Sequence, residues 1–193
     1  MTLALLIVAA GGILLVTSRT ALAIGAYVVL AAAASVLIAP AAAAAPLAAV
    51  AFSITTAMKT IVAPLVLLWF VRAQPAARDL RPSIPIPLRL LLAIGIAVAG
   101  LDSAIGLGVA VTAMGAALLI VHRNLIAHLI ALLVLGTGVT LCGAVLAPGV
   151  PETVELGATF DALVGTFVGL ALMRAFAAHD PLLDVESLRR LRG

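Results

Sequence analysis

One ionisable side chain stands in the middle of an apolar segment. Lys59 is the only lysine in the chain, and it lies in SITTAMKTIVAPLVLLWF, residues 53–70. Thr55 and Thr56 precede it by about one helical turn, so their hydroxyl groups can reach it, and Pro64 frees a backbone carbonyl one turn earlier because proline has no N–H. A charge in the hydrocarbon layer costs about 2.5–3.5 kcal/mol on insertion scales. The pattern predicts either a proton relay or a structural lysine paired with a neighbouring helix.

A second ionisable group, Asp161, lies in the segment ELGATFDALVGTFVGLALM. Gly157, Asp161, Gly165 and Gly169 recur every four residues, so they share one face of a helix. Gly165 and Gly169 form a GxxxG pair, which allows two helices to pack closely. We therefore expect the carboxyl group to face protein rather than lipid, either as a candidate proton relay or as a polar anchor in the packing.

His128 is the third candidate for a proton relay, although a single histidine near a helix end also fits a structural role. Gly136, Thr140 and Gly143 follow it at i, i+4 and i+7, and they predict a second small-residue face for helix packing. The one cysteine, Cys142, cannot form an internal disulfide. The sequence contains no nucleophile triad, phosphate loop, flavin motif or clustered metal ligands, so we expect no catalytic site.

The elements that position these residues are predicted to be membrane helices. The chain is 65% hydrophobic and 10% charged, whereas a soluble domain averages about 45–50% apolar and about 25% charged residues. A helix needs about 20 apolar residues to cross the hydrocarbon layer. Pro40 and Pro46 bracket the linker between the second and third spans. Five apolar blocks are expected to cross: Thr2–Val16, Ala21–Ala39, Leu47–Val71, Leu125–Leu146 and Leu156–Met173.

The region between the third and the later blocks is expected to hold two short spans. As one helix, Leu90–Val121 would be about 48 Å long at 1.5 Å per residue, which is too long for a single crossing. The segment GLDSAIG interrupts it at Asp102 and Ser103, and we expect Asp102 to be a turn residue. The predicted fold is therefore an all-α, polytopic bundle of about seven transmembrane helices.

The distribution of charge predicts the orientation of this bundle. With seven spans, every arginine falls on one side of the membrane, and Asp102, Glu152 and Glu155 fall on the other. Because arginine and lysine concentrate on cytoplasmic loops, we expect the N-terminus outside and the C-terminus in the cytoplasm, in the cytoplasmic (inner) membrane. The arginines concerned are Arg19, Arg72, Arg78, Arg81, Arg89, Arg123, Arg174, Arg189, Arg190 and Arg192.

The order of several motifs resembles a known family. HRNLIAHLIALLVL, with Arg123 and Asn124, resembles the start of the second helix in the K subunit of proton-pumping NADH:quinone oxidoreductase (complex I). MKTIVAP, with Lys59 and Pro64, the acid-containing helix around Asp161 and the tail sequence LDV resemble the E-type small membrane subunit of hydrogenase-4 and formate hydrogenlyase-like complexes. The resemblance implies four parts: a three-helix unit over residues 1–83, a short fourth span and turn over 84–103, a K-like three-helix unit over 104–176, and a cytoplasmic tail over 177–193.

One departure from the family concerns the sixth helix. K subunits carry a glutamate where this chain has Leu133, and the hydrogenase subunit has one slightly later, where this chain has Gly136 and Thr137. Residues 125–146 contain no acid at all. The proton path that the resemblance implies is therefore incomplete or rerouted here.

The resemblance implies a non-catalytic subunit in the membrane arm of a redox-driven, ion-translocating complex. Its partners would be antiporter-like and other membrane subunits together with the lipid bilayer, and not nucleic acid. This chain would hold no cofactor, and iron–sulfur and nickel–iron centres would lie in partner subunits. Two alternatives stay open: a subunit of a multisubunit cation/proton antiporter, and a small self-contained transporter with a substrate site around Lys59 and Asp161.

Overall fold

The computed structural model describes residues 2–42, 46–73, 78–80, 82–101, 103–146, 165–171 and 174–175. Within these residues the regular elements are helices, and the connections between them make two isolated backbone bridges, so the predicted all-α class is confirmed. The elements are α1 (Thr2–Val16), α2 (Thr20–Ala42), α3 (Pro46–Ala57), the π-helical turn η1 (Met58–Val62), α4 (Ala63–Ala73), α5 (Ile86–Gly100), α6 (Ala104–Val121) and α7 (Leu125–Leu146). Residues 165–171 and 174–175 are also helical.

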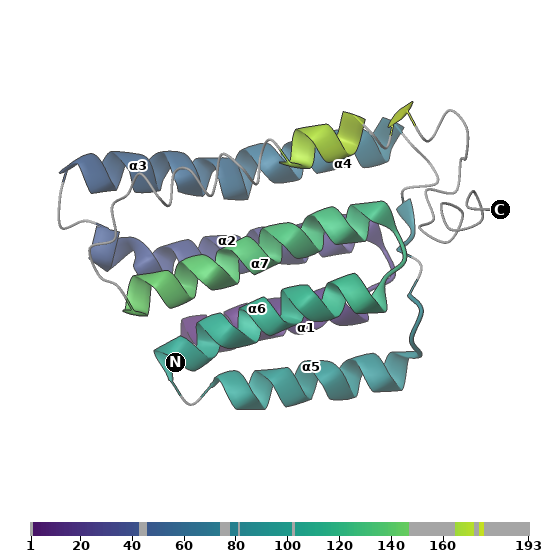
Figure 1. The fold of residues 1–193 in the computed structure, drawn as a ribbon, viewed down its shortest axis with the longest axis horizontal. Helices are drawn as coiled ribbons and strands as arrows, with labels where there is room; N and C mark the ends of the chain where they lie inside the picture. Colours follow the sequence, from purple (N-terminus) through teal and green to yellow (C-terminus); the bar gives the residue numbers. More distant parts are fainter. Residues whose placement is uncertain are drawn as a thin grey trace.

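Four helices form the centre of the bundle (Figure 1). Helices α1 and α2 pack on each other and against the antiparallel pair α6 and α7, while α5 covers α1 and α6 on one side. The continuous rod made by α3, η1 and α4 covers the opposite side and contacts α2. Buried side chains from the first and last parts of the chain therefore belong to one hydrophobic core, which includes Tyr27, Leu67 and Met114.

The outer surface of the bundle is apolar. Thr20–Pro40, Ala49–Ala73 and Leu125–Leu146 are long and apolar enough to cross a membrane, and three further apolar helices are shorter. Large apolar side chains point outward, among them Leu91 at 71% and Ile120 at 72% exposure. Helices are suited to the hydrocarbon layer of a membrane because all their backbone hydrogen bonds are made internally. The described part of the chain thus has the helix lengths and the surface of a membrane protein.

The expected break near residue 102 is confirmed. Helix α5 ends at Gly100, and Ser103 begins α6 as its N-cap, with the Ser103 Oγ accepting a hydrogen bond from the Gly106 N–H at 2.9 Å. A serine cap satisfies one of the backbone donors that a helix start leaves free. In the sequence, the polar Ser103 between two apolar segments indicates this break between α5 and α6.

Two expected helix boundaries are wrong. Helix α2 continues through Pro40 to Ala42 rather than ending at Ala39, because a membrane helix tolerates a proline whose missing bond is compensated locally. Helix α5 begins at Ile86, so Arg89 lies in its first turn and not in a loop. Arg89 is 3% exposed, and its guanidinium donates to the backbone carbonyls of Leu15 and Val16 at 3.4 and 2.8 Å. It thereby satisfies carbonyls that the end of α1 leaves free.

A close helix contact joins α6 and α7 through small residues. A Cβ added to Gly138 would lie 2.5 Å from the backbone nitrogen of Thr112, and one added to Gly108 would lie 2.8 Å from that of Cys142. A Cβ at Gly136 or Gly143 would meet no described atom within 4 Å. The described contacts therefore place the close packing of α7 against α6 at Gly138, which points about 200° away from Gly136 at 100° per residue. Packing on the expected face of Gly136, Thr140 and Gly143 stays a prediction.

The last helical residues lie beside α4 and α7. A Cβ on Gly169 would lie 2.8 Å from the Leu129 side chain of α7, whereas Gly165 has no described neighbour within 4 Å of such a Cβ. The Arg174 guanidinium stacks over the Trp69 ring of α4, 4.4 Å from its centroid. Gly157, the first member of the expected small-residue face, lies outside the described residues.

We predict that Gly138→Ala destabilises the protein and that Gly136→Ala does not. The new methyl group at position 138 would press on the Thr112 backbone, which cannot move without separating α6 from α7, and overpacking of this kind costs about 1–3 kcal/mol. At position 136 it would meet no described atom, and alanine favours a helix over glycine by about 1 kcal/mol. Thermal unfolding of both variants in the same detergent checks this. Equal stabilities of the two variants would contradict the packing described here.

Candidate functional site

Lys59 lies in the π-helical turn η1. The Ala63 N–H donates to the Met58 carbonyl, five residues earlier instead of four. Pro64 follows directly, and since it has no N–H it cannot make the normal α-helical bond to the Thr60 carbonyl. The wider turn accommodates this missing bond. Turns of this kind insert one extra residue into a helix and occur frequently at functional sites.

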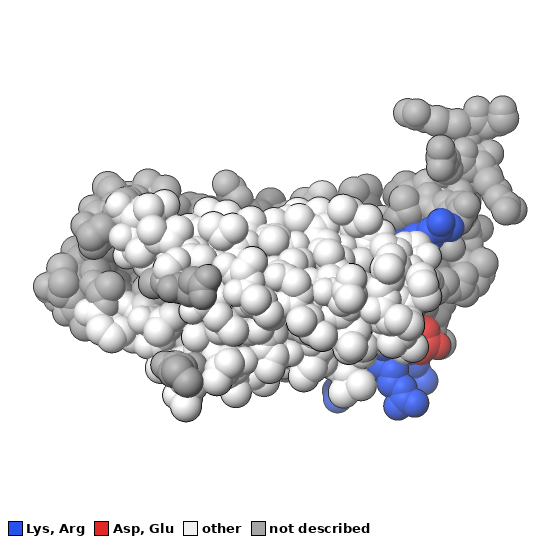
Figure 2. Space-filling model, turned by 90° about the horizontal axis from the view of Figure 1, so that it is seen from below, with Lys and Arg blue, Asp and Glu red and all other residues white. Residues whose placement is uncertain are grey.

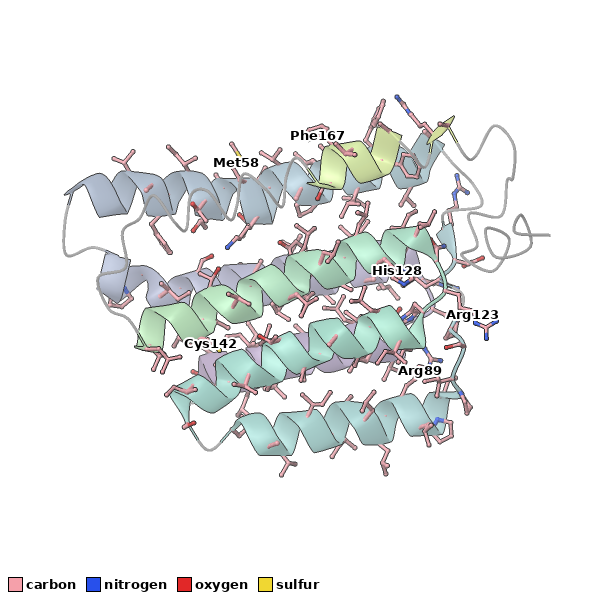
Figure 3. All side chains as sticks on the ribbon, viewed as in Figure 1. Met58, Arg89, Arg123, His128, Cys142 and Phe167 are labelled. Carbon is pink, nitrogen blue, oxygen red and sulfur yellow. The ribbon has the colours of Figure 1, made fainter. Side chains whose placement is uncertain are left out.

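The π turn directs the lysine toward α7. The Lys59 Nζ donates a hydrogen bond to the Thr140 Oγ1 at 3.0 Å, across 81 residues of sequence. Met58, labelled in Figure 3, marks the position of η1 in the rod that packs against α2. The polar partner that the sequence requires for this lysine is therefore a hydroxyl group on the sixth predicted helix. Thr140, expected only as a packing residue, contributes an acceptor instead.

The hydroxyl groups around Lys59 present lone pairs rather than protons. Ser35, Thr137 and Thr140 each donate their own hydroxyl proton to the carbonyl four residues earlier in their helix, at 2.8, 2.9 and 2.9 Å. A hydroxyl has one proton but two acceptor lone pairs, and a lysine ammonium has three donors and no acceptor. The arrangement is therefore complementary to the protonated form of Lys59.

A small cavity joins these groups. It has a volume of about 10 Å³, and its polar lining comes from three helical elements besides η1. A space of this size is at the lower limit for one water molecule, which would also need polar partners such as these. We call these residues the Lys59 site: Lys59 itself with Ser35 of α2, Thr55 and Thr56 of α3, and Thr137 and Thr140 of α7.

Tyr27 extends the polar groups beyond this cavity, and sequence reasoning missed it. Its side chain on α2 is fully buried beside Thr137. The Tyr27 hydroxyl makes no hydrogen bond to any described residue, while the Thr137 oxygen keeps a lone pair that could accept one. The sequence does indicate a polar face here, because Tyr27 and Ser35 stand at i and i+8 on one side of an otherwise apolar helix.

The structure does not bring His128, the other described candidate for a proton relay, to Lys59. His128 is only partly buried, and its Nδ1 lies 2.9 Å from the Asn124 carbonyl at the start of α7. It stands 12 residues before Thr140, which is about 18 Å along a helix axis. Asp161 lies outside the described residues. Of the two candidates that lie within the described residues, Lys59 has a polar site built around it, whereas the call on Asp161 stays a prediction.

Arg123 and Asn124 form the turn between α6 and α7, where the family-like motif was noted. The Asn124 side chain accepts from the Ile126 N–H at 2.9 Å, as an N-cap does, and donates to the Asp79 carbonyl at 3.1 Å. Figure 3 shows Arg123 beyond the helix ends, away from Met58, which directly precedes Lys59. The motif therefore serves to begin α7 and to hold a neighbouring loop.

Backbone bonds connect three loops at this end of the bundle. The Leu80 N–H donates to the Ser18 carbonyl and the Ser83 N–H to the Val121 carbonyl, each at 2.7 Å. The described arginines lie at this same end by their places in the chain: Arg19, Arg72, Arg78, Arg89, Arg123 and Arg174. Figure 2 shows basic groups gathered at one end of the face that it views. We call it the arginine end.

His122 is fully buried among these loops, just after α6. Its Nε2 lies 3.3 Å from the Thr17 carbonyl. Burial lowers the pKa of His122 below its ordinary value of 6.5, and the positive charges of Arg89 and His128 lower that pKa further, against the opposing effect of the Thr17 carbonyl. The folded protein therefore favours the neutral imidazole.

Comparison with known proteins identifies no relative. No protein-family model, curated protein or solved structure matches this chain. The resemblance to hydrogenase-4 subunits stays a prediction that rests on the order of motifs in the sequence.

We predict that acidification destabilises the protein through His122. The unfolded chain takes up a proton on this histidine as the pH falls through about 6.5, whereas the folded chain resists until a lower pH because its pKa is lowered. Stability should therefore fall as the pH drops below about 6.5, and this fall should be smaller in His122→Asn. Thermal unfolding between pH 8 and pH 5 measures it, with His128→Asn as the matched control. A wild-type pH dependence retained by His122→Asn would contradict the assignment.

Proposed function

We propose that this chain is a non-catalytic membrane subunit in which the Lys59 site forms a step in a proton path. The observation that carries the proposal is the 3.0 Å bond from Lys59 Nζ to Thr140 Oγ1, made from a π turn inside the apolar helix Ala49–Ala73. Ionisable side chains within membrane helices are expensive, face the bundle interior and mark ion or proton pathways. The hydroxyl lining offers a protonated lysine acceptors within the bundle.

The missing glutamate of the sixth helix fits a rerouted path. Helix α7 has no acidic residue. Instead, its Thr137 and Thr140 line the cavity at Lys59 and offer hydroxyl groups to the lysine. Hydroxyl groups cannot neutralise the charge of Lys59, but together with one water they can relay a proton by exchanging donor and acceptor roles. Tyr27 would extend this line toward the arginine end, because it lies beside Thr137 and closer to that end of α2.

We infer a place for the chain in a hydrogenase-4-like, complex-I-related assembly with about seven spans and a cytoplasmic arginine end. The support is the order of the sequence motifs together with an all-helical apolar bundle whose described arginines lie at one end. Redox centres would lie in partner chains, and antiporter-like subunits would flank this one. A self-contained transporter is less favoured, because the cavity at Lys59, about 10 Å³, has no room for a substrate larger than water.

The orientation can be tested from two exposed positions in a Cys142→Ala background. Ser18 lies between α1 and α2 at the arginine end, and Leu101 follows α5 at the opposite end; both are exposed. We expect a membrane-impermeant maleimide to label Leu101→Cys in intact cells and to label Ser18→Cys only after permeabilisation. Labelling of Ser18→Cys from outside would reverse the proposed topology.

The proton path predicts a specific pattern among three variants. Lys59→Met removes the charge but keeps an unbranched side chain, so the complex should assemble while proton flux is lost. Thr140→Val removes a hydrogen bond to a charged group, worth about 1.5–3 kcal/mol, and should slow flux on the order of tenfold. Thr60→Val is the matched control, because the Thr60 hydroxyl donates to the Thr56 carbonyl of its own helix.

Proton flux in reconstituted vesicles, normalised to assembled complex, measures all three. Unchanged flux with Lys59→Met would rule out the path through this site. A native-gel separation of the detergent-extracted complex tests the wider proposal: co-migrating iron–sulfur subunits support it, whereas antiporter subunits without redox centres, or a lone chain, would overturn the hydrogenase assignment.

A further inference from the structure

An open apolar groove runs between α1 and α5, on the side of the bundle away from Lys59. It encloses about 480 Å³ and is lined by Val8, Gly12 and Ile13 of α1 and by Leu90, Ala93 and Ala97 of α5. Gly12 keeps the floor open, since even an added Cβ would only just reach the Ala93 methyl group, at 3.9 Å. Figure 2 views the bundle from the α5 side and shows an uncharged surface with basic groups gathered at one end.

A buried cation, Arg89, lies next to the residues that line one end of this groove. The groove extends to Val16 and Leu90, which are the hydrogen-bond partner and the chain neighbour of Arg89. The Arg89 side chain is 3% exposed, its Nε makes no hydrogen bond to a described residue, and no described carboxylate pairs with it. An arginine cannot release its charge in a protein. The α1 carbonyls therefore satisfy part of this guanidinium, and its positive charge is not neutralised by any described carboxylate.

The surroundings of Arg89 add to the positive charge. The described residues of the arginine end carry six arginines and one carboxylate, that of Asp79. Helices α1 and α5 have 15 residues each, which is about 22 Å of helix against a hydrocarbon layer of about 30 Å. Short helices thin the bilayer around them and draw the headgroups inward. This brings lipid phosphates to the depth of Arg89.

We propose that the α1–α5 groove binds one anionic phospholipid, with an acyl chain along Gly12 and Ala93 and the phosphate at Arg89. Basic pockets between membrane helices recognise anionic headgroups, and here the charge sits at one end of an apolar channel, as in the lipid itself. An apolar helix of a partner subunit could fill the same groove, but it would not need a positive charge at the end of the groove, whereas an anionic lipid does. The site is independent of the Lys59 path.

Native mass spectrometry of the full-length protein, delipidated in detergent, tests this site. Dioleoylphosphatidylglycerol and dioleoylphosphatidylcholine share acyl chains and differ in headgroup charge. We expect one tightly bound phosphatidylglycerol, held roughly five- to thirtyfold more tightly than phosphatidylcholine, as one or two arginines near the phosphate would give. Equal affinities for the two lipids would overturn the proposal.

Two glycine variants locate the site. Gly12→Leu places a side chain in the groove and should abolish the preferred phosphatidylglycerol adduct. Gly25→Leu is the matched control, because Gly25 is exposed on α2 with no described atom within 4 Å of an added Cβ, and it should retain the adduct. Retention of the adduct by Gly12→Leu would show that the lipid binds elsewhere. Arg89→Gln should keep acyl binding but remove the headgroup preference, and a preference that survives this change would also contradict the proposal.

Discussion

The arrangement of this bundle depends on the free energy needed to hold one ammonium group within an apolar helix. Lys59 can remain there only if protein acceptors replace water around it. The π turn before Pro64 turns the side chain toward α7, and Thr140 accepts its hydrogen bond. The helix that supplies this acceptor is itself fixed by close contact with α6 at Gly138. The packing of small residues and the placement of the charge are therefore parts of one arrangement.

Hydrogen bonds at the arginine end hold the ends of the same helices in place. Arg89 holds the end of α1, and Asn124 begins α7 and holds the Asp79 loop. Backbone bonds from Leu80 and Ser83 join these loops into one layer. Helices fixed at one end keep their relative rotation along their length, which keeps the hydroxyl groups of α2 and α7 directed at Lys59. The Lys59 site and the distant loops are connected by rigid helices rather than by a chain of polar contacts.

Much of the helix pattern could be predicted from the sequence, because length and apolarity decide which segments form membrane helices. The bounds of α1 and α7 match the predicted blocks, and the polar break before Ser103 separates α5 from α6. The direction of each helix face could not be predicted. Helix α7 is apolar on all sides, so nothing in its periodicity distinguishes Gly138 from Gly136. Pro64 signalled a missing hydrogen bond, but only the structure shows that a π turn results and where it points Lys59.

Nitrogen-15 NMR of the lysine side chain tests whether Thr140 holds the Lys59 ammonium group inside the bundle, since the protein has a single lysine and therefore gives a single Nζ signal. We expect the signal of an ammonium group that is protected from exchange with water, that shifts in Thr140→Val and that does not shift in Thr60→Val. A signal that exchanges freely with water and is unchanged by Thr140→Val would place the lysine head at the membrane surface and show that Thr140 does not hold it.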